Sequence, residues 1–477
     1  MKRYRLHIWP VWLLLGMMFL TACQNDALPE VTGGGNGGAV TAEHYINLRI
    51  VGNSHAKTRA TFSDQATAAE NAVYDGILCI FEGADEASAT LQTAVAIDQL
   101  INNPGSTANS QDLSITQRLA DGTHIYQNKL YVLALLNTTS TGFKIGGTDK
   151  NELLLNGATQ KGKTISQIQQ LQINSVGSTD QHVGLFMSNA PQTGYIMPEV
   201  TSNYIYETKA AAATGSRLTI NVERAAARVK VTNETTAISA INLDGDENRH
   251  PTIHRMTWAL NKYNTTSYAI RNGSTAADNW ATSVGIPIAF DTTVPDIFDV
   301  YRQHAFNDGD DVYIAENTTS GQETEVIVEV QLKEGSFLLG DCYKYDQWGQ
   351  VIIFFTSAEA VINYCKEMWT SMFASDHEAI ASKSAEEVFK YPSFVIHDNG
   401  TVTLTLTNDS FNDTEKAALS SLSGLLSGFL TGYRDGKMYY TYKIKHDTNH
   451  EFGVVRNNAY NLTLQSSSIT GDWRPTP

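Results

Sequence analysis

The chain has 477 residues, 42% of them hydrophobic, which is enough for two or three domains with packed cores. It carries 50 acidic against 34 basic residues and a formal net charge of -16. Nucleic-acid binding relies on clustered Lys and Arg, so this balance argues against a nucleic-acid partner and favours solubility.

The N-terminus has the pattern of a lipoprotein signal peptide over residues 1–22. Three basic residues precede an apolar run over 8–19, and Leu20-Thr21-Ala22 stands directly before Cys23. The run is short for a membrane span and is interrupted by Pro10 and Gly16. We therefore expect export, cleavage before Cys23 and lipidation of that cysteine, so that the chain is tethered to a membrane.

The next segments predict a tether and then a folded domain. Residues 23–43 are expected to be flexible because glycine dominates 33–38. In the strand that follows, Ile46, Leu48 and Ile50 alternate with polar residues, which is typical of a half-buried strand. An alanine-rich polar stretch near 209–216 marks the expected boundary between a first domain over 44–215 and a second over 216–465.

Most of the remaining chain predicts short strands. Alternating runs predict them over 76–81, 129–136, 217–222, 228–232, 325–332, 401–407, 439–445 and 459–465. Many short strands at modest spacing indicate packed antiparallel sheets, and hence a mainly β chain of β-sandwiches. The few segments with helical spacing are 66–74, of one or two turns, and 165–171, 358–373 and 414–430, which we expect to pack on the sheets as crossover helices.

One segment, residues 157–164, fits the phosphate-loop pattern GxxxxGK[ST]. A nucleotide site would also need a later apolar strand ending in an Asp that holds the metal, and no such strand is found. The surrounding strands also look antiparallel. We interpret the segment as a polar loop with chance glycines.

No other motif predicts chemistry. The sequence contains no HExxH, CxxC or GxSxG pattern. One polar loop combines two histidines with three acidic residues, namely Asp244, Asp246, Glu247, His250 and His254. It can be interpreted as a weak cation site or, more simply, as a solvated loop. We expect no catalytic residue, no cofactor and no metal.

The other cysteines are Cys79, Cys342 and Cys365. Their odd number predicts no disulfide framework. Two alternatives remain for Cys342 and Cys365, a pair or separate buried thiols, and the second is favoured.

Several segments carry a family resemblance through their order along the chain. They are Thr58-Arg59-Ala60, 69–73, 77–81, 130–134, 186–189, 222–229, 313–318 and, most specific, Gly453-Val454-Val455-Arg456-Asn457-Asn458-Ala459-Tyr460-Asn461-Leu462. Together they resemble the fimbrillin family, the subunits of type V pili in Bacteroidales-type bacteria, and are most similar to its minor-fimbrillin branch.

The resemblance implies two tandem transthyretin-like β-sandwich domains and a lipoprotein precursor at the outer membrane that is later assembled into a cell-surface fimbrium. In such families an Arg-specific protease cuts after the first strand, here at Arg59–Ala60, so that residues 44–59 with Ile46, Leu48 and Ile50 can leave. A strand of another fimbrial subunit then takes their place, which is β-strand addition.

The resemblance also implies a C-terminal donor strand, here residues 466–477 with Ile469 and Trp473 as its anchors. This tail is short, and Pro475 and Pro477 cannot donate ladder hydrogen bonds. A stalk subunit and a tip or accessory subunit that accepts a strand without giving one both remain open.

A different class of function remains as the alternative, a lipid-anchored monomeric adhesin or glycan-binding lipoprotein. Its candidates for sugar stacking are Trp258, Trp280 and Trp348, although buried core tryptophans are commoner. A surface hydrolase would need a pair of acidic residues that the sequence does not indicate. Nothing in the sequence indicates the receptor.

Overall fold

The computed structural model describes residues 43–52, 66–97, 100, 108–109, 113–120, 123–125, 127–179, 183–235, 237–264, 266–271, 305–349, 351–446 and 452–465. The fold is mainly β, as the alternating sequence pattern predicts. Six residues with a predicted role lie outside the described residues: Cys23, Arg59, Ala60, Trp280, Ile469 and Trp473.

The first sandwich has one large sheet, in the order β14-β1-β15-β12-β7-β3-β4, with β6 also paired to β1 and β13 to β7. Its main strands are β1 Tyr45–Gly52, β3 Gly76–Gly83, β4 Thr90–Ala96, β6 Leu113–Arg118, β7 Lys129–Leu136, β12 Met187–Asn189 and β15 Leu218–Arg224. Shorter elements complete it: β2 Ala72–Val73, β5 Ala108–Asn109, β8 Phe143–Gly146, β9 Glu152–Leu155, β10 Ala158–Thr159, α2 Ile165–Gln169, β11 Gln172–Ile173, β13 Glu199–Val200, β14 Ile205–Tyr206 and α3 Lys209–Thr214.

The central strands of this sheet bury both faces. In β3, Leu78 and Ile80 pack in the core that contains β1, while Cys79 and Phe81 pack in a second core with β8, β9 and α2. In β7 the even-numbered and odd-numbered residues divide between the same two cores. Alternate side chains of a strand point to opposite faces, so a continuous apolar run here indicates a strand covered on both sides.

The second sandwich is built from β16 Ala226–Asn233, β17 Thr252–Asn261, β19 Phe306–Asn307, β20 Asp311–Ala315, β21 Glu325–Glu334, β28 Lys437–Lys443 and β29 Ala459–Leu464. The short strand β22 Phe337–Leu338 pairs with β21, whereas β18 Ser267–Tyr268 pairs with β11 of the first sandwich. One sheet has the order β20-β16-β29, and the other contains β19-β17-β21, with β28 paired to β21. A separate core fills it, with Trp258 fully buried at its centre.

The two sandwiches repeat one connectivity. In chain order, β1, β3, β4, β6, β7, β12 and β15 correspond to β16, β17, β19, β20, β21, β28 and β29. The parallel pair β1–β15 corresponds to the parallel pair β16–β29, and the antiparallel pair β1–β6 to β16–β20. The pairs β3–β4, β3–β7 and β7–β12 correspond to β17–β19, β17–β21 and β21–β28. The chain therefore uses the same seven-strand plan twice.

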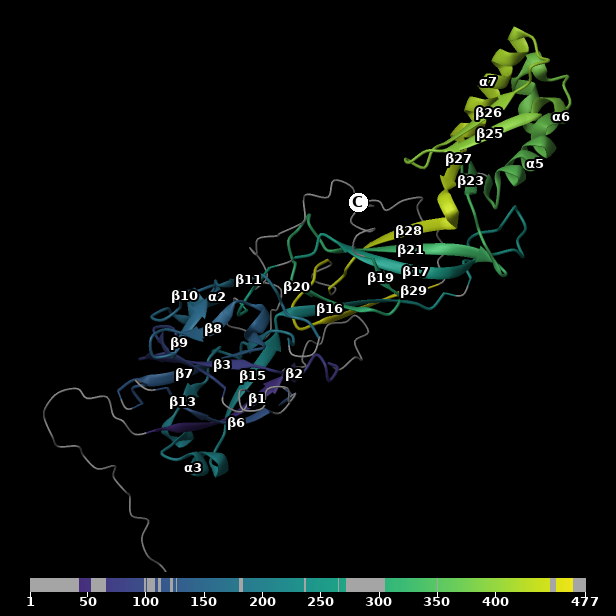
Figure 1. The fold of residues 1–477 in the computed structure, drawn as a ribbon. Coiled ribbons are helices and arrows are strands. Elements are labelled where there is room, and N and C mark those ends of the chain that lie inside the picture. The colour runs from purple at the N-terminus through teal and green to yellow at the C-terminus, as the bar shows by residue number, and fades with distance from the viewer. Residues whose placement is uncertain are drawn as a thin grey trace, which may run out of the picture. The chain divides into compact units, whose positions relative to one another are not determined.

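A third hydrophobic core lies between β22 and β28 in the chain. Its elements are β23 Cys342–Gln347, β24 Val351–Phe355, α5 Ala358–Met368, α6 Ala385–Val388, β25 Tyr391–Ile396, β26 Val402–Thr407, α7 Asp413–Gly428 and β27 Leu430–Tyr433. A π-helix, Trp369–Phe373, continues α5. Residues 216–465, expected as one sandwich domain, thus also contain an inserted α/β module whose helices α5 and α7 pack on its own strands (Figure 1).

Most predicted elements are present, and one is corrected. The helices expected over 165–171, 358–373 and 414–430 are found as α2, α5 with its π-helical extension, and α7. Residues 66–74, expected as one or two helical turns, form a single non-helical turn followed by the short strand β2. The turn is closed by the Glu70 carboxylate, which accepts from the Thr67 backbone at 2.6 Å, while the Thr67 hydroxyl accepts from the Glu70 backbone.

The three described cysteines are free and buried, so Cys342 and Cys365 do not form a disulfide. Burial raises the pKa of the Cys365 thiol to about 12, and burial raises that of Cys342 to about the same value. Both thiols are therefore protonated and unreactive at neutral pH.

Helix α7 covers the open edge of β26 in the inserted module. The backbone N–H groups of Leu404 and Leu406 donate to the hydroxyl oxygens of Ser427 and Ser423, at 2.9 and 3.0 Å. Each serine hydroxyl also donates to the helix carbonyl four residues earlier. The two serines therefore satisfy a sheet edge that would otherwise be open to strand pairing.

We predict that Ser423→Ala lowers the free energy of unfolding of the module by roughly 1–2 kcal/mol, because the buried N–H of Leu406 loses its acceptor. The matched control is Ser421→Ala, at an exposed position of the same helix, which is expected to change stability by less than about 0.5 kcal/mol. Chemical denaturation monitored by tryptophan fluorescence measures the free energy of unfolding of both variants. Equal effects of the two substitutions would contradict the role of Ser423 in satisfying the edge of β26.

Candidate functional site

The first strand that the structure describes, β1, is paired along both of its edges. It runs parallel to β15, with Leu48 opposite Leu218 and Gly52 opposite Val222, and antiparallel to β6, with Tyr45 opposite Arg118. The three strands lie side by side in Figure 1. A strand with a ladder on each side is interior to its sheet.

The side chains of β1 supply one wall of a hydrophobic core. Ile46, Leu48 and Ile50, the residues predicted from the alternating pattern, are each 0% exposed. They pack with apolar residues of β3, β6, β7 and β15. Burying three such side chains stabilises the fold by roughly 4.5–9 kcal/mol, at about 1.5–3 kcal/mol for each. Loss of β1 would therefore leave three adjacent apolar pockets.

A buried polar residue fixes the register of β1. The Asn47 side chain is 2% exposed and donates to the Gly215 carbonyl oxygen at 3.1 Å. A slip by one residue would turn Asn47 into the apolar core and expose the leucine and isoleucines. A Cβ at Gly215 would lie 2.2 Å from the Tyr206 ring, so any side chain there would require that ring to move.

The segment after the predicted cut is held independently of β1. Glu70 forms a buried ion pair with Arg228 at 3.4 Å, and the Arg224 guanidinium donates to the Asn71 side chain at 3.1 Å. Burial lowers the pKa of the Arg224 guanidinium. Both arginines belong to the segment that joins the two sandwiches. A cut between β1 and Glu70 would therefore separate the strand from a body that is already anchored.

A second buried network lies at the same junction. Arg456, 0% exposed, donates through Nε and Nη2 to the two carboxylate oxygens of Glu316, at 3.0 and 2.5 Å. It also donates to the Ser267 hydroxyl and the Tyr268 carbonyl oxygen. Arg271 pairs with Glu223, and the Glu223 carboxylate also interacts electrostatically with Arg456 and Glu316. Burial raises the pKa of the Glu223 carboxyl.

Sequence reasoning placed Arg456 in the most specific family motif but did not predict its partner. The two residues of the ion pair are 140 positions apart. An unpaired charge in this buried place would be strongly destabilising, so the motif keeps the junction intact. Nothing in the sequence spacing could have indicated Glu316 as the partner.

The polar loop over 244–250 has a structural role in the described chain. The Asp244 carboxylate accepts from the Thr356 backbone at 2.9 Å, and Arg249 pairs with both Asp244 and Glu334. These bonds connect the second sandwich to the base of the inserted module. Within the described ranges, no group of three His, Cys, Asp or Glu side chains is arranged to hold a metal ion.

The segment that fits the phosphate-loop pattern contains β10 and two glycine turns, with Gly157 and Gly162 at φ 86° and 80°. Lys163 donates to the Gln160 side chain at 2.7 Å, and Thr164 begins α2 with a capping box. The motif residues are thus accounted for by a turn and a helix start.

The candidate tryptophans differ in exposure. Trp258 is 0% exposed and lies in the core of the second sandwich, so it is no candidate for surface binding. Trp348 is 72% exposed in the turn between β23 and β24, where its ring contacts Phe429 edge-on at 4.9 Å between ring centroids.

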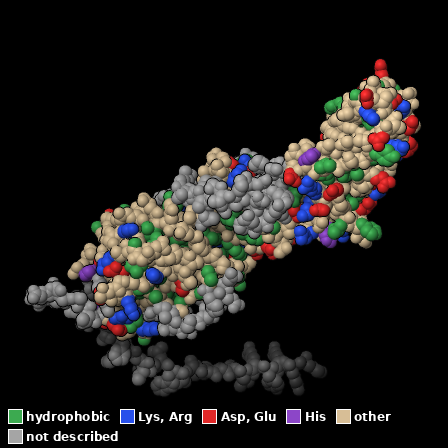
Figure 2. All heavy atoms as spheres, turned by 45° about the horizontal axis from the view of Figure 1, so that its top comes forward, with side chains coloured by type: hydrophobic (Ala, Val, Ile, Leu, Met, Phe, Trp, Pro, Cys, Tyr) green, Lys and Arg blue, Asp and Glu red, His purple; other side chains and the backbone are tan. Residues whose placement is uncertain are grey.

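On the face drawn in Figure 2, acidic and basic side chains are interspersed. None of the helices in the described chain is long and apolar enough to cross a membrane.

No family model matches the chain, and no curated protein matches it. Among solved structures, the chain is similar to a provisionally assigned cell adhesion protein from Bacteroides eggerthii, at 15% identity over 63% of this chain and 79% of that one, with a TM-score of 0.35. It is also similar to a fimbrial assembly protein from Parabacteroides distasonis, at 10% identity over 62% and 82%, with a TM-score of 0.32.

A further similar structure is the tip fimbrial protein Mfa3 from Porphyromonas gingivalis with C-terminal truncation, at 8% identity over 65% of this chain and 84% of that one, with a TM-score of 0.28. At these identities and TM-scores the likeness assigns neither a family nor a function to the chain.

We predict that Leu48→Ala lowers the free energy of unfolding of the first sandwich by about 2–5 kcal/mol, because it leaves a cavity at a fully buried position. The neighbouring exposed residue provides the control, and Arg49→Ala is expected to cost less than about 1 kcal/mol. Denaturant titration of both variants tests this. Equal stability of the two variants would show that β1 does not complete the core.

Proposed function

We propose that the chain is a structural subunit of cell-surface fimbriae, exported as an outer-membrane lipoprotein precursor through Cys23. The observation that supports this most directly is β1, a strand with a ladder on each edge and three fully buried apolar anchors. In the proposal, an Arg-specific protease cuts the Arg59–Ala60 bond, and β1 then leaves with residues 44–59. The role is structural and requires no catalytic residue or cofactor.

The geometry of β1 makes the consequence of its departure specific. The facing edges of β6 and β15 would lose their ladders, and the pockets of Ile46, Leu48 and Ile50 would open between them. Unpaired strand edges pair readily with another chain. A partner strand with apolar residues at alternate positions replaces both the hydrogen bonds and the side chains.

Repeated from subunit to subunit, such a contact is head-to-tail and does not close, so it builds a filament. The fimbrial and adhesive descriptions of the similar structures support this class of role. The two sandwiches with one shared connectivity also support the two transthyretin-like domains that the family resemblance implies.

One observation favours the alternative of a lipid-anchored monomeric adhesin. Trp348 presents a large exposed aromatic surface on the inserted module, the type of side chain that stacks on sugars. For this alternative we expect Trp348→Ala to reduce binding to a glycan panel more than tenfold while changing stability by less than about 0.5 kcal/mol. Unchanged glycan binding of that variant would remove this support.

The proposed exchange is tested with a labelled peptide of residues 43–52. We expect the peptide to enter the protein after an Arg-specific protease has cut at Arg59 and to stay out of uncut protein. Two controls are matched to the mechanism: a Leu48→Asp peptide, which would place a charge in an apolar pocket, and an Arg59→Ala protein, which leaves the bond intact. Mass spectrometry verifies the cut, and size-exclusion chromatography with fluorescence measures the bound peptide.

Equal binding of the native and the Leu48→Asp peptides would contradict the exchange, because it would show that the pockets do not select the strand. A cut protein that takes up neither peptide, with its original strand retained, would contradict it as well.

A further inference from the structure

The second sandwich departs from the first at one ladder. In the first sandwich, β12 pairs with β15, with Met187 opposite Arg224, and this joins β7 to β1 through continuous hydrogen bonding. The corresponding strands of the second sandwich are β28 and β29. Within the described residues, β28 pairs with β21 and β29 pairs with β16, and no ladder joins β28 to β29.

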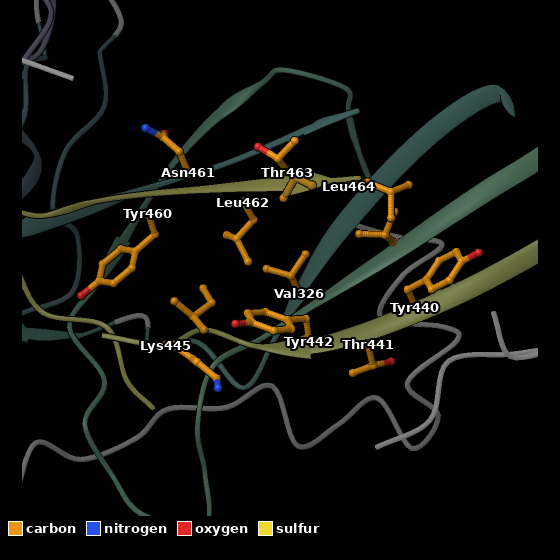
Figure 3. A pocket seen from close by; sticks show the side chains of 13 residues that line it. Val326, Tyr440, Thr441, Tyr442, Lys445, Tyr460, Asn461, Leu462, Thr463 and Leu464 are labelled. Carbon is orange, nitrogen blue, oxygen red and sulfur yellow. The ribbon is translucent and has the colours of Figure 1, made fainter. Parts of the chain in front are cut away.

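A groove occupies the place of this ladder. Its cavity volume is about 510 Å³, and its walls are β28, β29 and the valines of β16 and β21 beneath them. Figure 3 shows Leu462 and Leu464 pointing from β29 toward β28, whereas Asn461 and Thr463 point away. Leu462, Leu464 and Tyr440 belong to the core of the sandwich but are only half-buried. The apolar core therefore reaches the surface between these two strands.

We infer that the C-terminal tail of the same chain, residues 466–477, occupies this groove as an additional strand between β28 and β29. The tail begins at the groove, because β29 ends at Leu464, which is one of the lining residues. Residues 465–468 have the length of a four-residue hairpin loop. Residues 469–473 would then run antiparallel to the five groove-lining residues of β29, Tyr460–Leu464, over the same length of roughly 17 Å.

The sequence of the tail fits a strand with one apolar face. Ile469, Gly471 and Trp473 fall on one side, and Thr470 and Asp472 fall on the other. The apolar side matches the apolar floor of the groove, and the polar side matches solvent. Pro475 and Pro477, which cannot donate ladder hydrogen bonds, come after the five residues that pair.

The same residues fit the groove of β1 less well. That groove has three consecutive apolar positions, those of Ile46, Leu48 and Ile50, each fully buried. With Ile469 and Trp473 at the outer two, Gly471 would leave the central pocket of Leu48 empty, and an apolar cavity of that size is costly. The tail therefore suits its own sandwich better than the groove of a neighbouring subunit.

This use of the tail has a consequence that rests on the proposed function. A subunit whose tail fills its own second sandwich would accept a strand at β1 without giving residues 466–477 to a neighbour.

The test measures hydrogen exchange in the chain that is uncut at Arg59, with and without single substitutions at two adjacent positions of the tail. We expect Ile469→Asp to increase exchange of the β28 and β29 amides at least tenfold, because it places a charge against the apolar floor. Thr470→Asp, one residue further on and on the solvent side, is expected to leave these rates within twofold. A chain that ends at Gln465 should show the same increase, and a free peptide of residues 466–477 should reverse it.

The result that would overturn the inference is equal exchange in the two aspartate variants, or a truncated chain whose β28 and β29 amides are protected as before. A concentration-dependent dimer in which the tail crosses to a second copy would also overturn it, because the occupancy would then be intermolecular. The measurement uses uncut protein, so its outcome is independent of whether Arg59 is cleaved or β1 is exchanged.

Discussion

The pairing of β1 along both edges is the constraint on which the rest of the structure depends. It connects a parallel ladder with β15 to an antiparallel ladder with β6, and its three apolar side chains complete the core beneath. A strand in this position contributes much of the stability of its sandwich. It is also the first strand that the structure describes, and the predicted cut at Arg59–Ala60 follows it in the sequence. Under the proposed function, β1 is held in place until another strand replaces it.

The two sandwiches share one connectivity but differ in one ladder within the described residues. The first is closed by its own first strand and by the β12–β15 ladder, whereas the second lacks the corresponding ladder between β28 and β29 within the described chain. Between them, the buried pairs of Arg456 with Glu316 and of Arg228 with Glu70 hold the junction. A strand exchanged at β1 would therefore act on a body whose remaining contacts are already fixed.

The fold was predictable where a local pattern determines it. Alternation identified β1 and its three buried residues, and helical spacing identified α5 and α7. Periodicity gives the type of an element but not its neighbours, so the inserted α/β module with its separate core was not predicted. The bond from Asn47 to Gly215 joins residues 168 positions apart, and no local spacing indicates such a contact. Composition likewise could not distinguish buried Trp258 from exposed Trp348, because burial depends on the tertiary packing.

The most direct test of the central claim is the N-terminal residue of the protein recovered from sheared surface material. The account predicts Ala60, in protein that is part of filaments and has lost β1 together with its lipid. An intact lipidated Cys23 on protein without filaments would contradict it and would support a monomeric adhesin that remains in the outer membrane.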